Sequence, residues 1–366
     1  MSQSGVDALI AQDLGIVNII KKYFPSLKLH ASAQISIHNS YGLLEDQKAG
    51  FKRVILSREL SLQEIKIISN KTDIELEIFA HGALRFGVSG LCLMSSFIGG
   101  CSGNRGKCAQ PCRRRWSFNN KSGFYMSPKD LDLSKHIKEL KSLELTSLKI
   151  EGRIKNPQYV YSVVKAYKAL LSSSDENSCR QAKENIKQDL ARTKTNFNFI
   201  RKSEDIFTPD MPKQIGLYLG KIISVTNNSF TLKTNAALNV GDEIKIVDAS
   251  KDISYKAIIL NVKETLGNYE IATDFVFARQ GMHVFKTSDI KTAKIIEYIF
   301  NKTSIEKQQF IIKENKISTP LFKDNQIAPK LFLKVDNPRR TPIIKDKNLS
   351  LIFLLDRSTI KNTELF

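Results

Sequence analysis

The sequence predicts an α/β protein, with an incomplete β/α barrel of the TIM type followed by a small all-β barrel domain. Three patterns support this prediction. Short apolar segments alternate with amphipathic ones over the first 175 residues, polar residues stand where the apolar segments end, and closely spaced alternating strands begin near residue 213. With 366 residues, 42% of them hydrophobic, the chain is long enough for two domains with separate cores.

Residues 1–175 contain five apolar segments with the length and composition of strands. They lie at residues 7–13, 27–34, 52–59, 75–82 and 147–152. Amphipathic segments that predict helices lie at residues 15–24, 61–70 and 156–171; the last has Pro157 near its start, where the missing N–H costs little. This alternation predicts a parallel sheet with crossover helices, in a β/α barrel or in a doubly wound sheet.

Polar residues at the strand ends favour the barrel. They are Gln12, Asp13, Ser32, Gln34, Arg58, Glu59, His81, Lys149 and Glu151. Barrel enzymes place their sites at the carboxyl ends of strands. A helix N-cap or a surface ion pair is the ordinary role for any single one of these residues, but it explains the whole series less well. Because a complete barrel has eight strands, we expect its amino-terminal part to be missing.

The remaining residues divide into three segments. Residues 176–212 are polar and are interpreted as a connector with some helix. Six alternating strand segments within residues 213–290 predict the small β-barrel, which could bind nucleic acid or be a structural appendage. Residues 291–366 begin with a lysine-rich helical segment and contain two further strand-like segments. We interpret them as a linker and the start of a truncated further domain.

Four cysteines lie within twenty-one residues, at Cys92, Cys101, Cys108 and Cys112. The first residues carry no signal sequence and no apolar run reaches transmembrane length, so a cytoplasmic protein with reduced thiols is expected. Clustered thiols there more often share a metal than a disulfide. The pattern C-x8-C-x6-C-x3-C lacks the CxxC pairs of zinc sites and favours an iron–sulfur cluster. Cys179 lies apart and is interpreted as an ordinary free thiol.

The charge of the chain suggests an anionic partner. The net charge of +19 favours RNA or DNA over a membrane, although a lysine-rich surface would give the same value. Residues 81–129 contain eight Lys and Arg residues and no Asp or Glu. Within them, phosphate contacts are expected from Arg105, Arg113, Arg114 and Arg115. Trp116 is expected to stack on a base or to anchor the loop.

Several segments closely resemble the U-32 peptidase family, also called collagenase-like peptidases. They are ELEIFAHGALRFGVSGLCLMSSFIGGCSGNRGKCAQPCRRRW and SLKIEGRIKNPQYVYSVVKAYKALL, preceded in the same order by GVDALIAQDLG, LHASAQISIHN and RVILSREL. The resemblance covers residues 5 to about 175. The β-domain, introduced by ARTKTNFNF, resembles the longer members that act in ribosomal RNA hydroxylation.

The resemblance implies a β/α barrel in which cysteines hold a four-iron cluster. It implies oxygen-independent hydroxylation of a ribosomal RNA cytidine, a tRNA wobble uridine or a quinone precursor, with prephenate as co-substrate of the RNA-modifying members. It assigns Cys92, Cys108 and Cys112 as ligands, whereas Arg85 stands where the family motif HGALC has a cysteine. Three outcomes are compatible with this difference. Cys101 replaces the lost ligand, three thiolates hold a cluster with one iron open to substrate, or the site has decayed.

Three functions remain open at this point. Under the hydroxylase hypothesis, Glu59 and His81 are candidates for moving protons, with a structural hydrogen bond as the other role for His81. A peptidase is the second hypothesis, but neither HExxH nor GxSxG occurs. A cysteine nucleophile would need a histidine, and His81 is the nearest in sequence. The third hypothesis is an RNA-binding remnant without catalysis.

Overall fold

The computed structural model describes residues 6–302, apart from short gaps, and the strand backbone of residues 331–335 and 349–353. The gaps lie at residues 153–154, 174, 201–205, 210–215, 227–228, 250–252, 266–267 and 275–276. The chain divides into two compact units, Met1–Glu306 and Lys307–Phe366. Among the helices described, none combines the length and the apolar character that crossing a bilayer requires.

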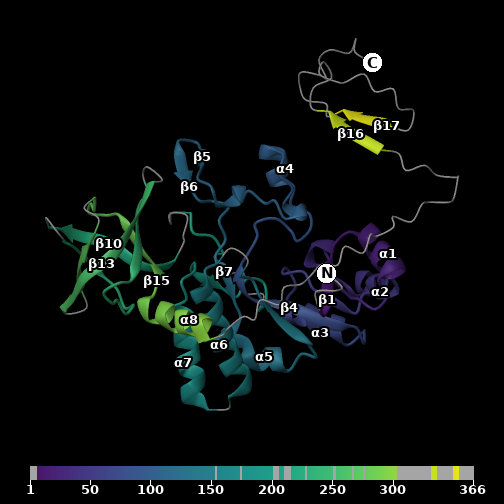
Figure 1. Cartoon of the computed structure of the whole chain (residues 1–366), viewed down its shortest axis with the longest axis horizontal. Helices are drawn as coiled ribbons and strands as arrows, with labels where there is room; N and C mark the ends of the chain where they lie inside the picture. Colours follow the sequence, from purple (N-terminus) through teal and green to yellow (C-terminus); the bar gives the residue numbers. More distant parts are fainter. Residues whose placement is uncertain are drawn as a thin grey trace, which may run out of the picture. The chain divides into compact units, whose positions relative to one another are not determined.

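A parallel sheet forms the centre of the first unit (Figure 1). Its neighbouring strands are, in order, β1 (Ala8–Ala11), β2 (Lys28–Ala31), β3 (Arg53–Ile55), β4 (Glu75–Ala83) and β8 (Ser147–Ile150). These are the five strands that the sequence predicts, and their parallel pairing is confirmed. The described strands make an open sheet that branches at β4 and ends at β1, β8 and β9, so closure into a TIM-type barrel is not seen among them.

Helices follow the strands along the chain. They are α1 (Leu14–Tyr23), α2 (Ser40–Lys48), α3 (Leu62–Ser69), α5 (Ile137–Lys141), α6 (Pro157–Ser172) and α7 (Glu176–Lys187). The first three begin where Asp13, Asn39 and Ser61 accept a hydrogen bond from a backbone N–H of the first turn, which satisfies a donor that the helix leaves free. The predicted helices α1, α3 and α6 are confirmed, whereas α2 was not expected.

The core of the first unit lies between the sheet and these helices. Along α6, the buried residues Val163, Ala166, Tyr167 and Leu170 recur every three or four positions and form one face of the helix. They pack in the same cluster as the fully buried strand residue Val54. Burying an aliphatic side chain of this size contributes about 1.5–3 kcal/mol each, so packing on the sheet dominates the stability of α6.

The residues expected to be a connector contribute to the same core. Ala182 and Ile186 of α7 are buried in it. After α7, β9 (Lys194–Thr195) pairs in parallel with β7 (Asp130–Asp132), and β7 runs antiparallel to β4. The structure therefore continues the first sheet into residues that polar composition alone does not identify as sheet.

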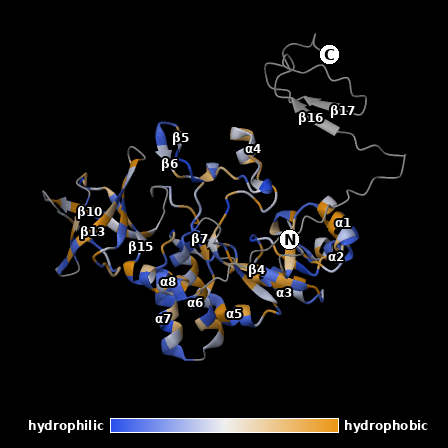
Figure 2. Cartoon of the chain, in the orientation of Figure 1, coloured by the Kyte–Doolittle hydropathy of each residue, from blue (hydrophilic) through white to orange (hydrophobic). Residues whose placement is uncertain are grey.

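A closed antiparallel barrel of six strands follows, as the sequence predicts. Its strands are β10 (Leu217–Val225), β11 (Ser229–Lys233), β12 (Glu243–Asp248), β13 (Ile253–Thr265), β14 (Asn268–Thr273) and β15 (His283–Ser288). Figure 2 shows hydrophobic and hydrophilic residues mixed along β10 and β13. In the apolar run of β13, Ala257 and Ile259 are buried, whereas Ile258 and Leu260 are exposed. Since successive strand residues point to opposite faces, this pattern fills the barrel with Leu219, Ile222 and their neighbours.

Helix α8 (Ile290–Lys302) follows the barrel and confirms the helical segment predicted there. The second unit contains a parallel pair of strands, β16 (Leu331–Val335) and β17 (Leu349–Phe353). Both match the strand-like segments of the sequence. The interpretation of this region as a truncated further domain stays a prediction.

Candidate functional site

The cysteine-rich segment forms a long loop between β4 and β7. It contains α4 (Met94–Gly99) and a hairpin of β5 (Trp116–Phe118) and β6 (Lys121–Gly123). Because β4 and β7 are antiparallel neighbours, both ends of the loop leave the sheet on the same side. This is the carboxyl end of β4, the side on which the polar strand ends of the parallel sheet lie.

Three of the four loop cysteines are neighbours in the fold. Burial raises the pKa of the Cys112 thiol above its usual value, and Cys108 and Cys92 are close enough to raise it further. The charge of Arg113 and a hydrogen bond from the backbone of Phe86 act in the opposite direction. These three cysteines are the set that the family resemblance implies.

Hydrogen bonds and close backbone packing surround Cys108 and Cys92. The Sγ of Cys108 accepts from the Ser95 hydroxyl at 3.6 Å and from the Gln110 backbone N–H at 3.4 Å. Gly87 packs directly on Cys92, because a Cβ at position 87 would lie 3.1 Å from the Cys92 sulfur. These contacts fix the position of the Cys108 sulfur and leave little free space beside Cys92.

Cys101 is held in a different way, through its backbone. Its N–H donates to the Ser95 carbonyl at 3.2 Å, and its carbonyl accepts from the Ser96 hydroxyl at 3.1 Å. Among the described residues, no group of three or more Cys, His, Asp or Glu side chains has the geometry of a metal site. Cys92, Cys108 and Cys112 nevertheless supply soft sulfur donors in a loop that has no acidic residue, which is the donor chemistry that iron–sulfur clusters require.

Two polar residues from strand ends hold the loop to the sheet. Oε1 of Glu59 accepts hydrogen bonds from the backbone N–H and the hydroxyl of Ser89, at 2.9 and 3.1 Å. The carbonyl of Gln34 lies against Gly90, where a Cβ would come within 2.2 Å of that oxygen and φ is +79°. Only glycine combines this conformation with such a close approach.

Arg85, at the position of the family's fifth motif residue, also faces Gln34. With the Gln34 amide oxygen turned toward it, both terminal nitrogens of Arg85 donate at 3.2 Å. The nearby Arg58 forms a 2.9 Å ion pair with Glu151 and lies 3.7 Å over the ring of Phe79. Burial lowers the pKa of Arg58 to about 10, and the charge of Arg85 adds to this effect.

His81 lies in the interior, with no exposed surface. Its Nε2 is 2.9 Å from Asp189 Oδ2, and its Nδ1 is 3.5 Å from Asp132 Oδ1. Burial alone would lower the pKa of His81, but the hydrogen bonds to Asp132 and Asp189 outweigh it and raise the pKa above the usual value. The hydroxyl of Tyr167, 3.4 Å from Nδ1, completes the surroundings of the ring. These surroundings favour the protonated form of the ring.

A further buried carboxylate, which sequence reasoning missed, lies two residues before Asp132 in β7. Asp130 is fully buried and pairs with Lys155 at 2.9 Å and Arg192 at 3.2 Å. Although burial opposes ionisation, these cations hold the pKa of Asp130 well below its usual range. Lys155 and Arg192 both lie in segments that carry the family resemblance, which was the only sequence signal for them.

The basic residues of the loop have different surroundings. Arg105 and Arg114 are exposed, and Arg115 donates to the Ala249 carbonyl at 2.7 Å. Arg113, expected to contact phosphate, is instead buried with 3% of its surface exposed. Its guanidinium donates to the Leu84 carbonyl at 2.7 Å and to the Pro128 carbonyl, which leaves it without access to a ligand outside the loop.

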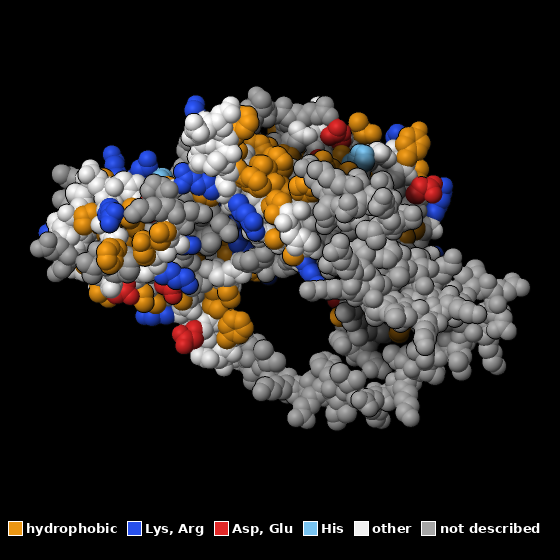
Figure 3. Space-filling model, turned by 90° about the horizontal axis from the view of Figure 1, so that it is seen from above, with side chains coloured by type: hydrophobic (Ala, Val, Ile, Leu, Met, Phe, Trp, Pro, Cys, Tyr) orange, Lys and Arg blue, Asp and Glu red, His pale blue; other side chains and the backbone are white. Residues whose placement is uncertain are grey.

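Trp116 and several apolar residues complete the face of the loop. The Trp116 indole N–H donates to the Pro111 carbonyl at 3.2 Å, which ties the half-buried ring to the loop. Large apolar side chains stay exposed nearby, including Leu91, Leu93 and Phe97. Figure 3, seen from the side of α4 and β5, shows hydrophobic side chains gathered beside Lys and Arg side chains. Such a mixture suits a partner with both charged and aromatic groups.

Comparison with known proteins gives several relatives. An uncharacterized protease of Methanocaldococcus jannaschii is 36% identical over 275 residues, covering 66% of this chain and 65% of the relative. A 23S rRNA 5-hydroxycytidine synthase of Escherichia coli is 31% identical over 273 residues, covering 70% and 41%. A tRNA hydroxylation protein of Bacillus subtilis is 33% identical over 186 residues, covering 47% and 44%. The chain thus matches between 41% and 65% of the length of these relatives.

The family relationship follows from a match over the sheet and its loop together. The model of peptidase family U32 matches residues 1–208, which include all seven strands of the first sheet and the four clustered cysteines. This stretch is more than half of the chain. The protein therefore belongs to peptidase family U32.

Proposed function

We propose that this chain hydroxylates RNA in an oxygen-independent reaction that depends on an iron–sulfur cluster. The observation that carries the proposal is the gathering of Cys92, Cys108 and Cys112 in a basic loop at the carboxyl ends of parallel strands. The relatives named for ribosomal RNA 5-hydroxycytidine synthesis and for tRNA hydroxylation support RNA as the substrate. A ribosomal RNA cytidine and a tRNA uridine are the two substrates that this proposal allows. RNA and reduced thiols both suit the cytoplasm.

In this proposal the sheet is an arc of a TIM-type barrel, and the loop stands at its mouth. Cys92, Cys108 and Cys112 hold the four-iron cluster, with Cys101 as provisional fourth ligand. The bound cluster supplies one-electron redox chemistry, with prephenate as co-substrate on the ground of family resemblance alone. Side chains of the protein itself bind the RNA and move the proton.

The polar residues around the loop take distinct roles in the proposal. The exposed Arg105 and Arg114 bind phosphates of the RNA, because guanidinium groups match phosphate oxygens. Oε2 of Glu59 is buried and has no partner among the described atoms, so it can take a proton from a group beside the loop. His81 positions the strand end instead, because both of its nitrogens face carboxylates.

Anaerobic expression followed by ultraviolet–visible spectra and iron and sulfide analysis tests the proposal. We expect a brown protein with cluster absorption. Cys92→Ser, Cys108→Ser and Cys112→Ser should each lose iron. Cys101→Ser keeps its iron if three thiolates hold the cluster and loses it if Cys101 is the fourth ligand. Wild-type protein that stays colourless and binds no iron under these conditions contradicts the proposal.

Proteolysis is the alternative, favoured by the name of the family and by the relative from M. jannaschii named as a protease. Within the described residues, however, the nitrogens of His81 face Asp132 and Asp189, and the ring is fully buried. His81 therefore does not supply the base that a cysteine nucleophile needs. A colourless protein that cleaves a peptide would favour this alternative, and one that only binds RNA would indicate a remnant without catalysis.

A further inference from the structure

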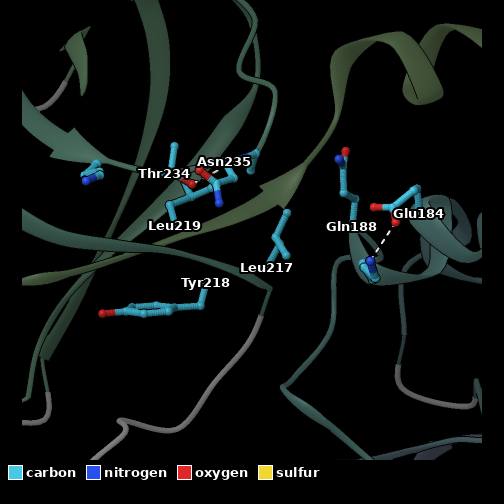
Figure 4. Close-up of a pocket in the computed structure, with 10 residues that line it drawn as sticks. Glu184, Gln188, Leu217, Tyr218, Leu219, Thr234 and Asn235 are labelled. Carbon is cyan, nitrogen blue, oxygen red and sulfur yellow. Dashed lines mark hydrogen bonds and ion pairs between the residues drawn. The ribbon is translucent and has the colours of Figure 1, made fainter. Parts of the chain in front are cut away.

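A groove lies between α7 and the β-barrel of the first unit. Its larger part, a cavity of about 570 Å³, lies between the end of α7, the start of β10 and the turn after β11 (Figure 4). A second cavity of about 300 Å³ extends from it toward α6 and α8. Gln188 and Leu217 line both cavities, so the two are neighbours, and together we call them the groove. Cavities of these volumes are in the range of ligand sites.

The carboxylates that line the groove are already paired. Glu184 lies 2.6 Å from Lys187 on the same helix. Asp189 lies 2.6 Å from Lys194 and also bonds His81. Asp289 lies 2.7 Å from Lys286. The acidic side chains of the groove therefore leave little negative charge to repel an anion.

Three lysines of the groove have no carboxylate partner among the described residues. They are Lys165 on α6, Lys233 at the end of β11 and Lys291 on α8, and all three are exposed. The Lys165 ammonium only approaches Tyr161, at 3.5 Å from its hydroxyl and 5.5 Å from the ring centre. Together they give the groove a surplus of positive charge, which selects an anionic ligand.

Amide side chains supply a second kind of contact. Asn185, Gln188 and Asn235 line the groove, and their side chains make no hydrogen bond within the described part of the chain. In Figure 4, Gln188 stands on the helix side and Asn235 on the barrel side. An amide offers both a donor and an acceptor, which matches the edge of an unpaired base. Lysines with uncommitted amides between them fit a strand that carries phosphates and bases alternately.

We propose that this groove binds a single-stranded segment of the RNA substrate, with Lys165, Lys233 and Lys291 on phosphates and Asn235 and Gln188 on base edges. The inference rests on the proposed function, because it is that function which makes RNA the anion. It adds a second contact to the one at the cysteine loop. A strand held at two separate places is fixed in register, so the groove would help to choose which nucleotide reaches the loop.

Fluorescence anisotropy with a labelled oligouridine, on the full chain, tests the groove. The double variant Lys233→Gln/Lys291→Gln is compared with Lys256→Gln/Lys263→Gln, which removes two equally exposed lysines of β13 outside the groove. We expect the groove variant to bind about tenfold more weakly and to lose roughly 1.4 from the slope of log affinity against log salt, since each single-strand phosphate contact contributes about 0.7. The control should change affinity by less than about twofold.

Further measurements separate the possible failures. Circular dichroism checks that both double variants fold. Equal binding by the two variants overturns the inference, and so does an equal loss of affinity for labelled oligoglutamate, because the groove would then select charge rather than RNA. Asn235→Ala should change the ratio of affinities for oligouridine and oligoadenosine, and an unchanged ratio overturns the base contact. If cluster absorption and RNA hydroxylation persist in the groove variant while affinity is unchanged, only this inference fails. If the wild type binds no RNA, both fail.

Discussion

The Nε2 of His81 lies 2.9 Å from the Oδ2 of Asp189, although 108 residues separate the two in the sequence. The contact joins the end of β4 to the segment between α7 and β9. It closes a buried group in which Asp132 approaches the other ring nitrogen at 3.5 Å. His81, which the sequence suggests as a catalytic residue, is therefore the centre of a buried ion-pair group.

His81→Gln should destabilise the fold strongly. The substitution leaves the buried carboxylates of Asp132 and Asp189 without their shared cation, which typically costs about 3–5 kcal/mol of unfolding free energy. Urea denaturation measures this, with the exposed His38→Gln as control, expected to change stability by less than about 0.5 kcal/mol. A loss no larger than that of the control would show that the pair contributes nothing.

The same pair predicts a dependence on pH. The hydrogen bonds that His81 makes to Asp132 and Asp189 raise its pKa above the usual 6.5 despite burial. The folded state therefore holds the proton more tightly than the unfolded state. This stabilisation is complete below pH 6.5 and is lost as the pH rises through the raised pKa. Urea denaturation of wild type and His81→Gln across this window should show a larger fall in the wild type, because the variant lacks the part due to His81.

Asp46 on α2 also makes stability fall as the pH rises, here because its carboxyl group is buried. Burial raises the pKa of its carboxyl group to about 6 from 3.8, and its Oδ2 has no partner among the described atoms. Folding therefore favours the protonated acid, and stability falls as the pH rises through about 6. Asp46→Asn should stabilise the protein at alkaline pH by roughly 1–3 kcal/mol and have little effect at acid pH.

Glu45→Gln on the same helix is the matched control for that experiment, because its side chain is 70% exposed. Its unfolding free energy should follow the wild type across the pH range. If Asp46→Asn follows the wild type as well, the carboxyl group is ionised without cost in the folded state.

Arg113 and Arg114 should separate stability from RNA binding. Arg113→Gln removes a buried guanidinium that donates to the Leu84 carbonyl, and it should lower the unfolding free energy by about 2–3 kcal/mol. Arg114→Gln should leave stability unchanged and weaken RNA binding, because Arg114 is exposed. Thermal unfolding and anisotropy with labelled RNA measure the two effects. Loss of RNA affinity in both variants, with full stability, would mean that Arg113 turns outward.

Gly90→Ala should disturb the loop far more than Gly100→Ala. Both positions have positive φ, at +79° and +66°, so both substitutions carry the conformational cost of about 1 kcal/mol. At position 90 the new Cβ would also meet the Gln34 carbonyl at 2.2 Å, whereas nothing lies within 4 Å at position 100. Denaturation curves should therefore show an additional loss of about 1–3 kcal/mol for Gly90→Ala alone. Equal losses would show that the loop can move away from Gln34.

Local patterns in the sequence identify five strands of the first sheet, the six strands of the barrel and the group of cysteines. Alternation and turn residues are local signals, so the six barrel strands and the five parallel strands could be predicted. In the polar strand ends, Asp13 and Ser32 are only helix caps, while Glu59 and Gln34 do contact the loop. A sequence places such residues at one edge of the sheet but does not distinguish these two roles.

The remaining features depend on contacts between distant residues. Strands β7 and β9 have three and two residues, too few for a pattern, and exist because β7 pairs with β4 and β9 pairs with β7. In the sequence, Asp189 resembles an ordinary surface acid. Only the fold shows that its carboxylate lies beside His81. In the run of three arginines after Cys112, composition cannot tell that Arg113 alone turns inward.

The hydrogen bond between Glu59 and Ser89 holds one part of the cysteine loop more firmly than the rest. It fixes the base of the loop to the segment that follows β3, while Phe97 on α4 is 93% exposed. Amide hydrogens near Ser89 should thus exchange with deuterated solvent much more slowly than those of α4. Because the Ser95 hydroxyl of α4 bonds the Cys108 sulfur at 3.6 Å, opening of this helix would displace a cysteine as well.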